Sequence, residues 1–336
     1  MSRVDVVIPC YMYGHYLRGC VESVLRQEGV EVRVLILDDA SPDDTPAVAA
    51  ALVREDSRVE YRRHAVNQGH IATYNEGLLE WTSGDYCLLL SADDRLIPGA
   101  LGRATRVMDT HPQVVLVYGR SVDVRDDKPV PPVLAPIAAE VTILTGRQFL
   151  ELTCRTGQNQ VSCPTAVVRT SVQKRVGGYS EELPHAGDME MWLRLALQGQ
   201  VCNLNMWQAY YRKHSGNMST YYMEYAFRDI QQRFDAFEYV FRAHRDTIPD
   251  HVQLQSEYRS ALSQMAFWGA QHAFEQYNME AYQDYLAFAI YCDPKIRQSR
   301  SWLRMRWKQM MGPALFNFLS KFTRRLGIRG ELSKTS

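Results

Sequence analysis

The amino-acid sequence predicts an α/β fold in which a mostly parallel β-sheet is flanked by helices and followed by a helical C-terminal region. Three observations support this prediction. Short apolar runs typical of buried strands alternate with segments whose apolar residues recur at helical spacing. Two of the apolar runs end in pairs of aspartates. Beyond about residue 218 the alternation stops, and the rest of the chain has only helical patterns.

The strand and helix patterns alternate over the first two hundred residues. Apolar β runs cover residues 3–8, 32–37, 59–62, 86–90, 114–118 and 165–168. Helical spacing covers residues 17–25, 42–54, 71–81, 98–109, 146–154 and 189–198. This order predicts parallel pairing with right-handed crossovers. Residues 121–140 are rich in proline and charge, so we expect a surface loop there.

The length of the chain predicts more than one structural unit, because 336 residues exceed a small single domain. We expect a catalytic domain over residues 1–218 and a helical region over residues 219–336. The second region has many aromatic residues, which we expect to pack between its helices.

Composition excludes several classes of protein. Lys plus Arg and Asp plus Glu both total 38, so the global charge does not favour a nucleic-acid partner. The seven cysteines are scattered without zinc spacing, which favours core positions in a reducing compartment. The first strand begins almost at the N-terminus, and no stretch approaches the roughly 18 apolar residues of a membrane span. We therefore expect a cytoplasmic protein, soluble or peripheral to a membrane.

The two aspartate pairs predict a binding site. Asp38 and Asp39 follow the second strand, and Asp93 and Asp94 follow the strand at 86–90. The carboxyl ends of the strands form the ligand crevice of open α/β sheets. Paired carboxylates after a buried strand are unfavourable unless a cation or polar ligand lies there. The alternative for each pair is a solvated turn, or for Asp39 a helix-flanking acid.

Several short motifs occur together in a characteristic order. They are Val6-Val7-Ile8-Pro9-Cys10-Tyr11, Asp38-Asp39-Ala40-Ser41, Asn67-Gln68-Gly69, Asn75-Glu76-Gly77, Gly84-Asp85-Tyr86, Ser91-Ala92-Asp93-Asp94, Gly177-Gly178-Tyr179 and Gly187-Asp188-Met189-Glu190-Met191-Trp192. From Val4 to about Ser219 the chain resembles an inverting family 2 glycosyltransferase of the GT-A fold. Such enzymes move a sugar from a nucleotide donor to an acceptor.

The resemblance implies roles for residues on the donor side. Asp39 would hydrogen-bond the donor's base, and the backbone from Pro9 to Tyr11 would line the nucleoside. Asp94 would hold a divalent metal, and Asp93 would contact the ribose or reach the metal through water. Oxygen ligands point to Mg²⁺ or Mn²⁺. The donor is a UDP-, GDP- or dTDP-sugar.

The resemblance also implies a catalytic base and a closing loop. Asp188 would take the proton of the acceptor, although a simple helix cap is the alternative. Gly187 replaces the acid that usually precedes this base. Within Tyr211 to Ser219, His214 would contact the metal or the diphosphate, and Arg212 and Lys213 would meet the phosphates.

The end of the chain is basic and amphipathic. From Pro294 to Gly330 there are ten lysines or arginines and no acidic residue, interleaved with tryptophan and bulky apolar residues. This composition suits a helix at an anionic membrane surface, such as the inner face of the plasma membrane, and equally a helix packed on protein. We expect a glycan or lipid-linked saccharide acceptor from cell-surface polysaccharide biosynthesis.

Two other functions remain open from the sequence. A sugar nucleotidyltransferase would also use acids, a metal and a nucleotide, but its glycine- and arginine-rich N-terminal phosphate loop is absent. A non-catalytic nucleotide-binding scaffold of a polysaccharide assembly complex is the second alternative. The joint presence of Asp39, Asp93, Asp94 and Asp188 argues against the scaffold. Dehydrogenases and P-loop NTPases are disfavoured because their glycine motifs are missing after the first strand.

Overall fold

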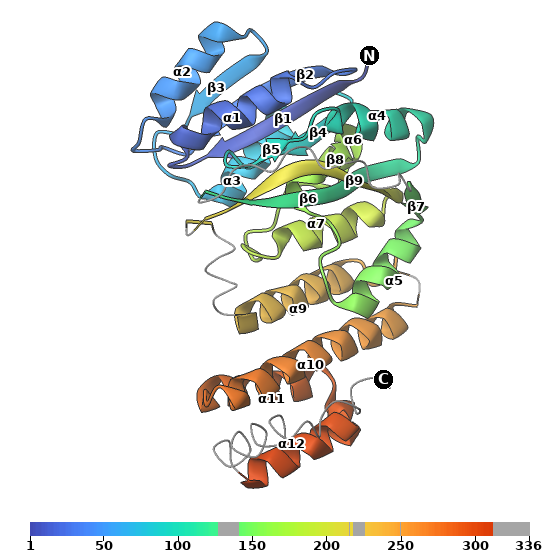
Figure 1. The fold of residues 1–336 in the computed structure, drawn as a ribbon. Coiled ribbons are helices and arrows are strands. Elements are labelled where there is room, and N and C mark those ends of the chain that lie inside the picture. Colours follow the sequence, from blue (N-terminus) through green and yellow to red (C-terminus); the bar gives the residue numbers. More distant parts are fainter. Residues whose placement is uncertain (127–140, 215, 218–225, 249, 312–336) are drawn as a thin grey trace, which may run out of the picture.

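The protein is an α/β structure in which helices cover both faces of one sheet and further helices stack beyond one of them (Figure 1). The computed structural model describes residues 1–126, 141–214, 216–217, 226–248 and 250–311. The α/β class predicted from the sequence is confirmed.

The described strands form one nine-stranded sheet. Its order is β3 (Val59–Arg63), β2 (Glu31–Asp38), β1 (Arg3–Cys10), β4 (Tyr86–Leu89), β8 (Val167–Arg169), β6 (Val114–Arg125), β9 (Gln200–Lys213) and β5 (Arg95–Leu96), with β7 (Thr142–Leu144) paired to β9. Within the described chain, four strand pairs are parallel and four antiparallel, so the sheet is mixed rather than mostly parallel. The expected parallel pairing holds from β3 to β4, where successive strands are joined by helical crossovers.

Most helices lie where the sequence predicts them. These are α1 (Gly14–Leu25), α2 (Thr45–Glu55), α4 (Ala100–Thr110), α5 (Gly146–Thr156) and α7 (Gly187–Ala196). The helix expected over residues 71–81 divides into α3 (His70–Asn75) and a π-helical segment (Glu76–Trp81). The sequence analysis missed α6 (Thr170–Val176) and the short strands β5 and β7. Residues 121–125 of the expected loop continue β6, and residues 127–140 lie outside the described part of the chain.

The longest strand, β9, was also missed. It covers Gln200–Lys213, of which we expected the last residues to belong to a loop. The alternation that marks a half-buried strand is interrupted where Asn205 adopts a φ of 47°, and the pairing with β6 shifts register nearby. A strand with such irregularities carries no clear period of two in its sequence.

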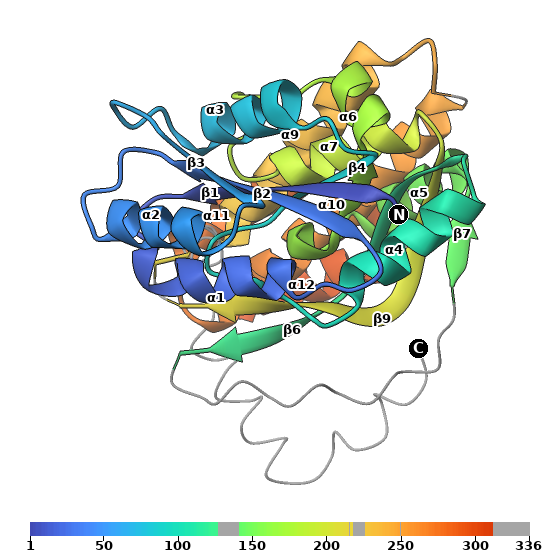
Figure 2. The ribbon, with the colours of Figure 1, turned by 90° about the horizontal axis from the view of Figure 1, so that it is seen from above.

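The core has one apolar layer on each face of the sheet. Val6 of β1 packs with Leu17 of α1 and Leu101 of α4 on one face. Val7 points to the opposite face, where it packs with Leu78 and Met191. Figure 2 shows the sheet between these two sets of helices, with α1 and α2 on one side and α3, α6 and α7 on the other. Alternation along β1 thus holds both layers together.

Helices from residue 226 onward stack on the second layer. They are α9 (Ala226–Ala243), α10 (His251–Glu275), α11 (Met279–Cys292) and α12 (Arg300–Met311), with a 3₁₀ segment at Pro294–Gln298. Leu193 of α7 shares one buried cluster with Phe237 of α9 and Tyr258 of α10, and these two rings stack with centroids 4.4 Å apart. Phe234, Phe237 and Phe241 thus pack between helices as predicted, whereas Trp268, Tyr277 and Tyr291 are more than half exposed. Tyr221, Tyr222 and Tyr225 lie outside the described residues. The expected boundary near residue 218 also falls there, and it stays a prediction.

A buried ion pair fixes α7 to the segment before it. Glu190 is fully buried and pairs with Arg194, with 2.5 Å between Oε1 and Nε. The same guanidinium donates to the carbonyls of Val176 and Gly178 at 2.6 and 2.7 Å. Because every charge is hydrogen-bonded, the pair holds α7 and the Gly177-Gly178 segment in one position. The predicted base Asp188 therefore sits on a helix whose start is fixed.

None of the helices in the described residues combines the length and the hydropathy that a membrane span requires.

Candidate active site

The two aspartate pairs lie at the same edge of the sheet. β1 runs parallel to both β2 and β4, with Cys10 level with Asp38 and Val7 level with Leu89. The backbone N–H of Asp39 donates to the carbonyl of Cys10 at 2.9 Å, so Pro9 and Tyr11 lie beside this pair. Tyr11 is 45% exposed, which leaves its side chain open to solvent.

Asp38 is a structural residue. It is fully buried, and it accepts hydrogen bonds from the Ser41 N–H at 2.8 Å and the Tyr61 hydroxyl at 2.9 Å. The Arg63 guanidinium lies 3.3 Å from the same carboxylate. Its charge is compensated inside the fold, and its contacts hold the turn that presents Asp39.

Asp39 is held by three donors. Its Oδ1 accepts from the Gln68 N–H and from His64 Nδ1, both at 2.8 Å, and its Oδ2 accepts from the Gly69 N–H at 2.9 Å. Burial opposes the charged form, but these hydrogen bonds outweigh burial and lower the pKa of Asp39. Asp39 is therefore an ionised carboxylate with a fixed orientation.

His64 connects Asp39 to a second acid. Its Nδ1 faces Asp39 and its Nε2 faces Glu76 Oε2, each at 2.8 Å. Burial disfavours the imidazolium, but the two carboxylates outweigh burial and raise the pKa of His64. Both ring nitrogens can donate only in the protonated form. The sequence analysis did not select His64 or Glu76, because their relation to Asp39 is set by the fold.

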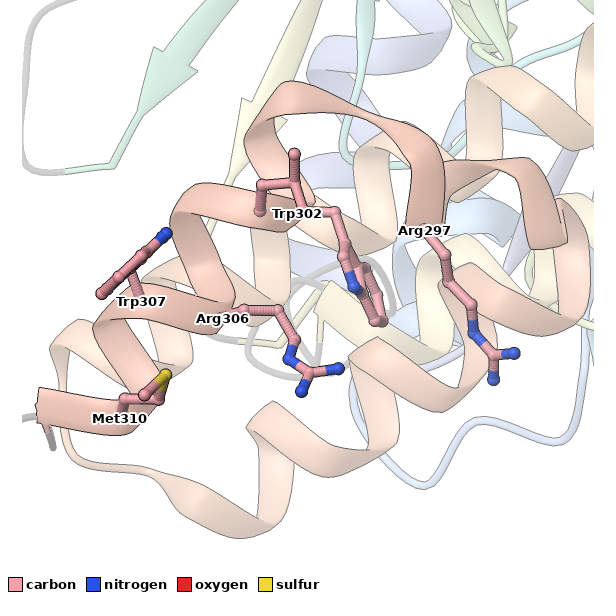
Figure 3. Close-up of a pocket in the computed structure, with 6 residues that line it drawn as sticks. Arg297, Trp302, Arg306, Trp307 and Met310 are labelled. Atoms are coloured by element: carbon pink, nitrogen blue, oxygen red, sulfur yellow. The ribbon is translucent and has the colours of Figure 1, made fainter.

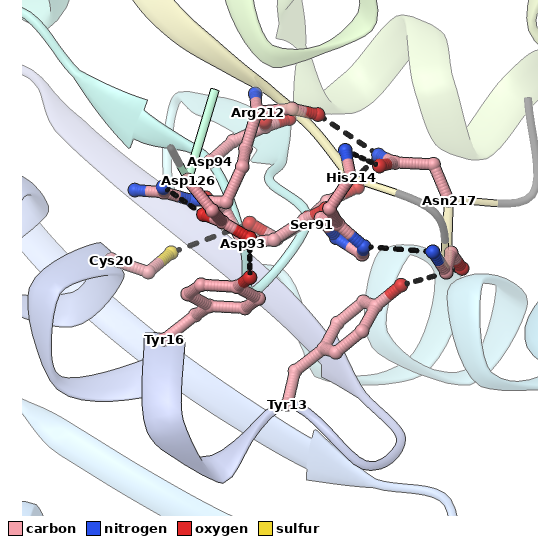
Figure 4. Close-up of polar contacts among 11 residues, drawn as sticks. Tyr13, Tyr16, Cys20, Ser91, Asp93, Asp94, Asp126, Arg212, His214 and Asn217 are labelled. Atoms are coloured by element: carbon pink, nitrogen blue, oxygen red, sulfur yellow. Dashed lines mark hydrogen bonds and ion pairs between the residues drawn. The ribbon is translucent and has the colours of Figure 1, made fainter. Parts of the chain in front are cut away.

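Asp93 and Asp94 form the second pair, and both are almost completely buried (Figure 4). Asp93 Oδ2 lies 3.2 Å from His214 Nε2 and 3.3 Å from Asn217 Nδ2. In the described part of the chain, the Asp94 carboxylate has one partner, the Arg212 N–H at 2.9 Å. Burial raises the pKa of both groups, and for Asp94 the neighbouring charge of Asp93 adds to the effect. This pair carries less compensation than Asp38 or Asp39.

The side chain of Arg212 in β9 is held in place by neighbouring residues. Its Nε donates to the Asp93 carbonyl at 3.0 Å, and its Nη1 donates to Asp126 at 2.7 Å. The guanidinium carbon lies 4.7 Å from the ring centroid of Tyr16, whose hydroxyl also bonds Asp126. Arg212 thus positions the acid turn, and its positive charge lies next to Asp93 and Asp94. Lys213 points elsewhere and pairs with Asp123 at 2.6 Å.

His214 donates to the acid pair. The Gly216 N–H donates to its Nδ1 at 3.1 Å, so the proton of the neutral ring is on Nε2, facing Asp93. The Tyr13 ring packs edge-on against the imidazole at 5.4 Å, and the Tyr13 hydroxyl donates to the Gly216 carbonyl at 3.1 Å. Figure 4 shows α1 and the end of β9 meeting around Asp93 through these contacts.

The carboxylates of Asp93 and Asp94 fit a hard divalent cation that takes its other ligands from water and substrate. Asp93 and Asp94 are adjacent, buried carboxylates, which are the ligands that Mg²⁺ and Mn²⁺ prefer. In the described residues no three His, Cys, Asp or Glu side chains converge as a metal site. Mg²⁺ typically uses one or two carboxylates together with waters and substrate phosphates. His214 Nε2 carries a proton in this arrangement, so the carboxylates are the better ligands.

Asp188 lies in the first turn of α7 and is partly exposed. Its Oδ2 accepts from Asn159 Nδ2 at 2.9 Å, and its Oδ1 accepts from the Met189 N–H at 2.7 Å. Burial raises the pKa of Asp188, while these hydrogen bonds and the charges of His185 and Arg233 act in the opposite direction. Negative charge on Asp188 and on Asp94 raises the pKa of the Cys163 thiol, after the larger effect of its burial. The charges of both acids therefore act on the same thiol.

Several residues of this site were not singled out from the sequence. Tyr13 and Tyr16 of α1, Asn159 and Asp126 carry no motif that marks them. Asn217 stands in the segment that resembles the family's closing loop, but its bond to Asp93 depends on the fold. Asn159 and Asn217 contact the acids directly, whereas Tyr13, Tyr16 and Asp126 hold the residues around His214 and Arg212. Such partners have no fixed sequence spacing.

The fold and the site define a class of protein, namely α/β proteins that hold acidic residues at the carboxyl edge of parallel strands, where such sheets form their ligand crevice. The family model for glycosyl transferase family 2 matches residues 5–174. The chain belongs to this family, as the motifs indicated.

Curated relatives match parts of the chain. It is 29% identical over 208 residues to the uncharacterized protein MT1568 of Mycobacterium tuberculosis, a match that covers 59% of this chain and 63% of the relative. It is 30% identical over 102 residues to the GalNAc(5)-diNAcBac-PP-undecaprenol beta-1,3-glucosyltransferase of Campylobacter jejuni, covering 30% of this chain and 33% of that protein. The chain thus spans less than two thirds of the length of either relative.

Solved structures confirm the fold. TarS residues 1–349 of S. aureus, solved with UDP-GlcNAc, align with a TM-score of 0.62 at 16% identity, over 87% of this chain and 82% of that one. The mannosyltransferase PcManGT of Pyrobaculum calidifontis, solved with GDP-Man and Mn²⁺, aligns with a TM-score of 0.52 at 15% identity, over 88% and 86% of the two chains. At these identities the alignments support the GT-A fold alone.

The contacts of His64 predict how stability depends on pH. Because the pKa of His64 is raised in the folded protein, its contribution to stability is complete below the unfolded value of about 6.5 and is lost as the pH rises through the folded value. We expect the difference in free energy of unfolding between wild type and His64→Gln to shrink as the pH rises from 5.5 to 8.5 (from about one unit below the unfolded pKa to about two units above it). Urea unfolding at each pH measures it. A difference that grows with pH would contradict this prediction.

Proposed function

We propose that this protein is an inverting, metal-dependent glycosyltransferase that moves a sugar from a nucleoside diphosphate donor to an acceptor hydroxyl. The observation that carries the proposal is the buried Asp93–Asp94 pair, which the described residues leave incompletely compensated at the edge that also presents Asp39. Membership of family 2 supports the reaction class. A bound cation would relieve the repulsion between these two carboxylates.

On the donor side, each part of the nucleotide has a candidate partner. Asp39 would receive a hydrogen bond from the base, and the backbone from Pro9 to Tyr11 would line the nucleoside. Arg212 and His214 would place positive charge and an N–H group near the diphosphate. Asp94, with Asp93, would hold the metal, which when bound stabilises charge on the leaving diphosphate. The structural neighbours solved with UDP-GlcNAc and with GDP-Man and Mn²⁺ are consistent with such a donor.

On the acceptor side, Asp188 would act as the general base. Its carboxylate would take the proton of the acceptor hydroxyl as that oxygen attacks the anomeric carbon from the face opposite the leaving group. A raised pKa brings a carboxylate closer to the working pH and makes it a stronger base. Asn159 fixes the orientation of Oδ2, so Asp188 is positioned before the acceptor arrives.

We expect metal-dependent release of a nucleoside diphosphate from one donor in a panel of UDP-, GDP- and dTDP-sugars. Release should require Mn²⁺ or Mg²⁺, should stop on addition of EDTA, and should be lost in Asp94→Asn because that carboxylate would hold the metal. Asp44→Asn removes an exposed acid near the same edge and should behave as wild type. Release that is equal with EDTA, or equal in Asp94→Asn, would contradict metal dependence.

Replacing the proposed base should separate chemistry from binding. We expect Asp188→Asn to lower kcat by about 10²–10⁴-fold while the affinity for the nucleotide changes little. Asn159→Ala removes a hydrogen bond that lowers the pKa of Asp188, so its acidic limb in a plot of log kcat against pH should move to higher pH. Steady-state kinetics from pH 4.5 to 8.5 would measure both effects (a range of about four units that begins just above the usual carboxyl pKa). An Asp188→Asn variant with wild-type kcat would exclude Asp188 as the base.

We further propose that α12 places the enzyme at the cytoplasmic face of the plasma membrane, next to a lipid-linked saccharide. Trp302 stacks on Phe267, whereas Leu303, Trp307 and Met310 are 58%, 66% and 77% exposed. Their spacing of four and three residues places them on one face of the helix. Arg297 and Arg306 line the same hollow (Figure 3), so cationic and apolar groups are presented together. The Campylobacter relative is named for an acceptor linked to undecaprenol, and we extend that class to this chain as part of the proposal, within cell-surface polysaccharide biosynthesis.

Vesicle flotation tests this location. We expect the full chain to float with phosphatidylglycerol vesicles and not with phosphatidylcholine vesicles. Trp307→Ala should bind about tenfold more weakly because a large apolar side chain no longer enters the interface. Val252→Ala, which shortens an exposed side chain at the start of α10, should bind as wild type. Equal binding by Trp307→Ala would indicate that α12 faces protein instead.

A further inference from the structure

We propose that the Asp39 site, held by His64 and Glu76, selects uracil or thymine over guanine as the base of the donor. The inference rests on the proposed function, in which Asp39 faces the base. It goes further by deriving the class of base from the number of hydrogen bonds that Asp39 can still accept.

The acceptor positions of Asp39 can be counted. An ionised carboxylate has about two acceptor positions on each oxygen. On Oδ1, both are used, by His64 Nδ1 and the Gln68 N–H. On Oδ2, the Gly69 N–H uses one. Counting donors in the described residues, one acceptor position on Oδ2 remains for a ligand.

The three donors are fixed by their own contacts. His64 is held between two carboxylates, and its side chain is 7% exposed. Arg62 lies 3.7 Å from Glu76, so this second acid is also oriented. Gly69 has a φ of 86°, a conformation that favours glycine, and its N–H is also shared with Asn67 Oδ1 at 3.0 Å. Because the groups that carry these donors are all held in place, breaking one of their hydrogen bonds to free an acceptor position on Asp39 would cost free energy.

The pairing edges of the bases differ in the number of donors. Guanine presents two adjacent donors, N1–H and the 2-amino group, which a carboxylate accepts with one oxygen each. Uracil and thymine present one donor, N3–H, between two carbonyl oxygens. The single position on Oδ2 satisfies N3–H, whereas guanine would leave one N–H unpaired because Oδ1 is saturated. An unpaired buried donor weakens binding by about tenfold or more.

Calorimetric titration of the full chain with UDP, dTDP and GDP in Mn²⁺ buffer tests the selection. For the wild type, we expect Kd for UDP and dTDP to be at least about tenfold lower than Kd for GDP. His64→Ala removes one donor from Oδ1 and opens an acceptor position for the second donor of guanine. The preference should then fall to about threefold or less, with UDP binding weakened because Asp39 loses its orientation.

His111→Ala is the matched control. It removes an exposed histidine at the end of α4 and leaves the three donors of Asp39 in place, so the preference of the wild type should remain. If His64→Ala fails to fold, as judged by its thermal midpoint, the ratio measured on the wild type still decides the proposal. Equal or tighter binding of GDP by the wild type would overturn the selection alone. Binding of no nucleoside diphosphate would overturn it together with the proposed function, whereas UDP-selective binding without sugar transfer from any donor would contradict only the transferase.

Discussion

The rest of the site depends on one constraint, namely that four buried carboxylates at one sheet edge must each be compensated. Parallel pairing of β1 with β2 and β4 brings both pairs to this edge. Asp38 is compensated by a hydroxyl, a backbone N–H and an arginine, and Asp39 by two backbone N–H groups and an imidazole. Asp94 has a single backbone donor in the described structure. Since buried charge without a partner is costly, the decline in compensation from Asp38 to Asp94 marks the place where the proposed cation would bind.

The sequence predicted the acids but not which groups compensate them, although Arg212, His214 and the Asn67-Gln68-Gly69 motif had been singled out for other reasons. Asp39, Asp93 and Asp94 were visible because each follows an apolar run that has a clear strand pattern. The donors are different, since His64 follows Asp39 by 25 residues and Arg212 follows Asp94 by 118. No local pattern connects residues at such separations, because they meet only when β3 pairs with β2 and when β9 passes the end of β4. The strand β9 was missed for a different reason, because its irregular register removes the period of two on which a strand prediction depends.

Arg212 shows how a plausible residue can have a different use once the fold is known. An arginine beside a diphosphate site would be expected to bind phosphate directly. Here its guanidinium is engaged by Asp126, by the Asp93 carbonyl and by the ring of Tyr16. Its charge still lies next to the acid pair, so it reduces the electrostatic cost of keeping Asp93 and Asp94 ionised. Arg212, near the end of β9, therefore contacts both the acid turn and Tyr16 of α1. To bind a phosphate directly, its guanidinium would have to give up the hydrogen bond to Asp126.

The proposed acceptor side includes parts of the chain that lie outside the matched family region. The family model ends at residue 174, whereas Asp188 begins α7 and its charged surroundings include α9. His185 pairs with Asp229 at 3.0 Å, and Arg233 of the same helix lowers the pKa of Asp188 through its charge. Leu193 of α7 is buried with Phe237 of α9, so the helix that carries the proposed base and the helix that carries Arg233 pack against each other. The helices after residue 226 thus take part in setting the acid–base properties of Asp188. In the proposed function, donor binding relies on Asp39, Asp93 and Asp94 within the matched region, whereas the proposed base and the helices packed around it lie beyond that region.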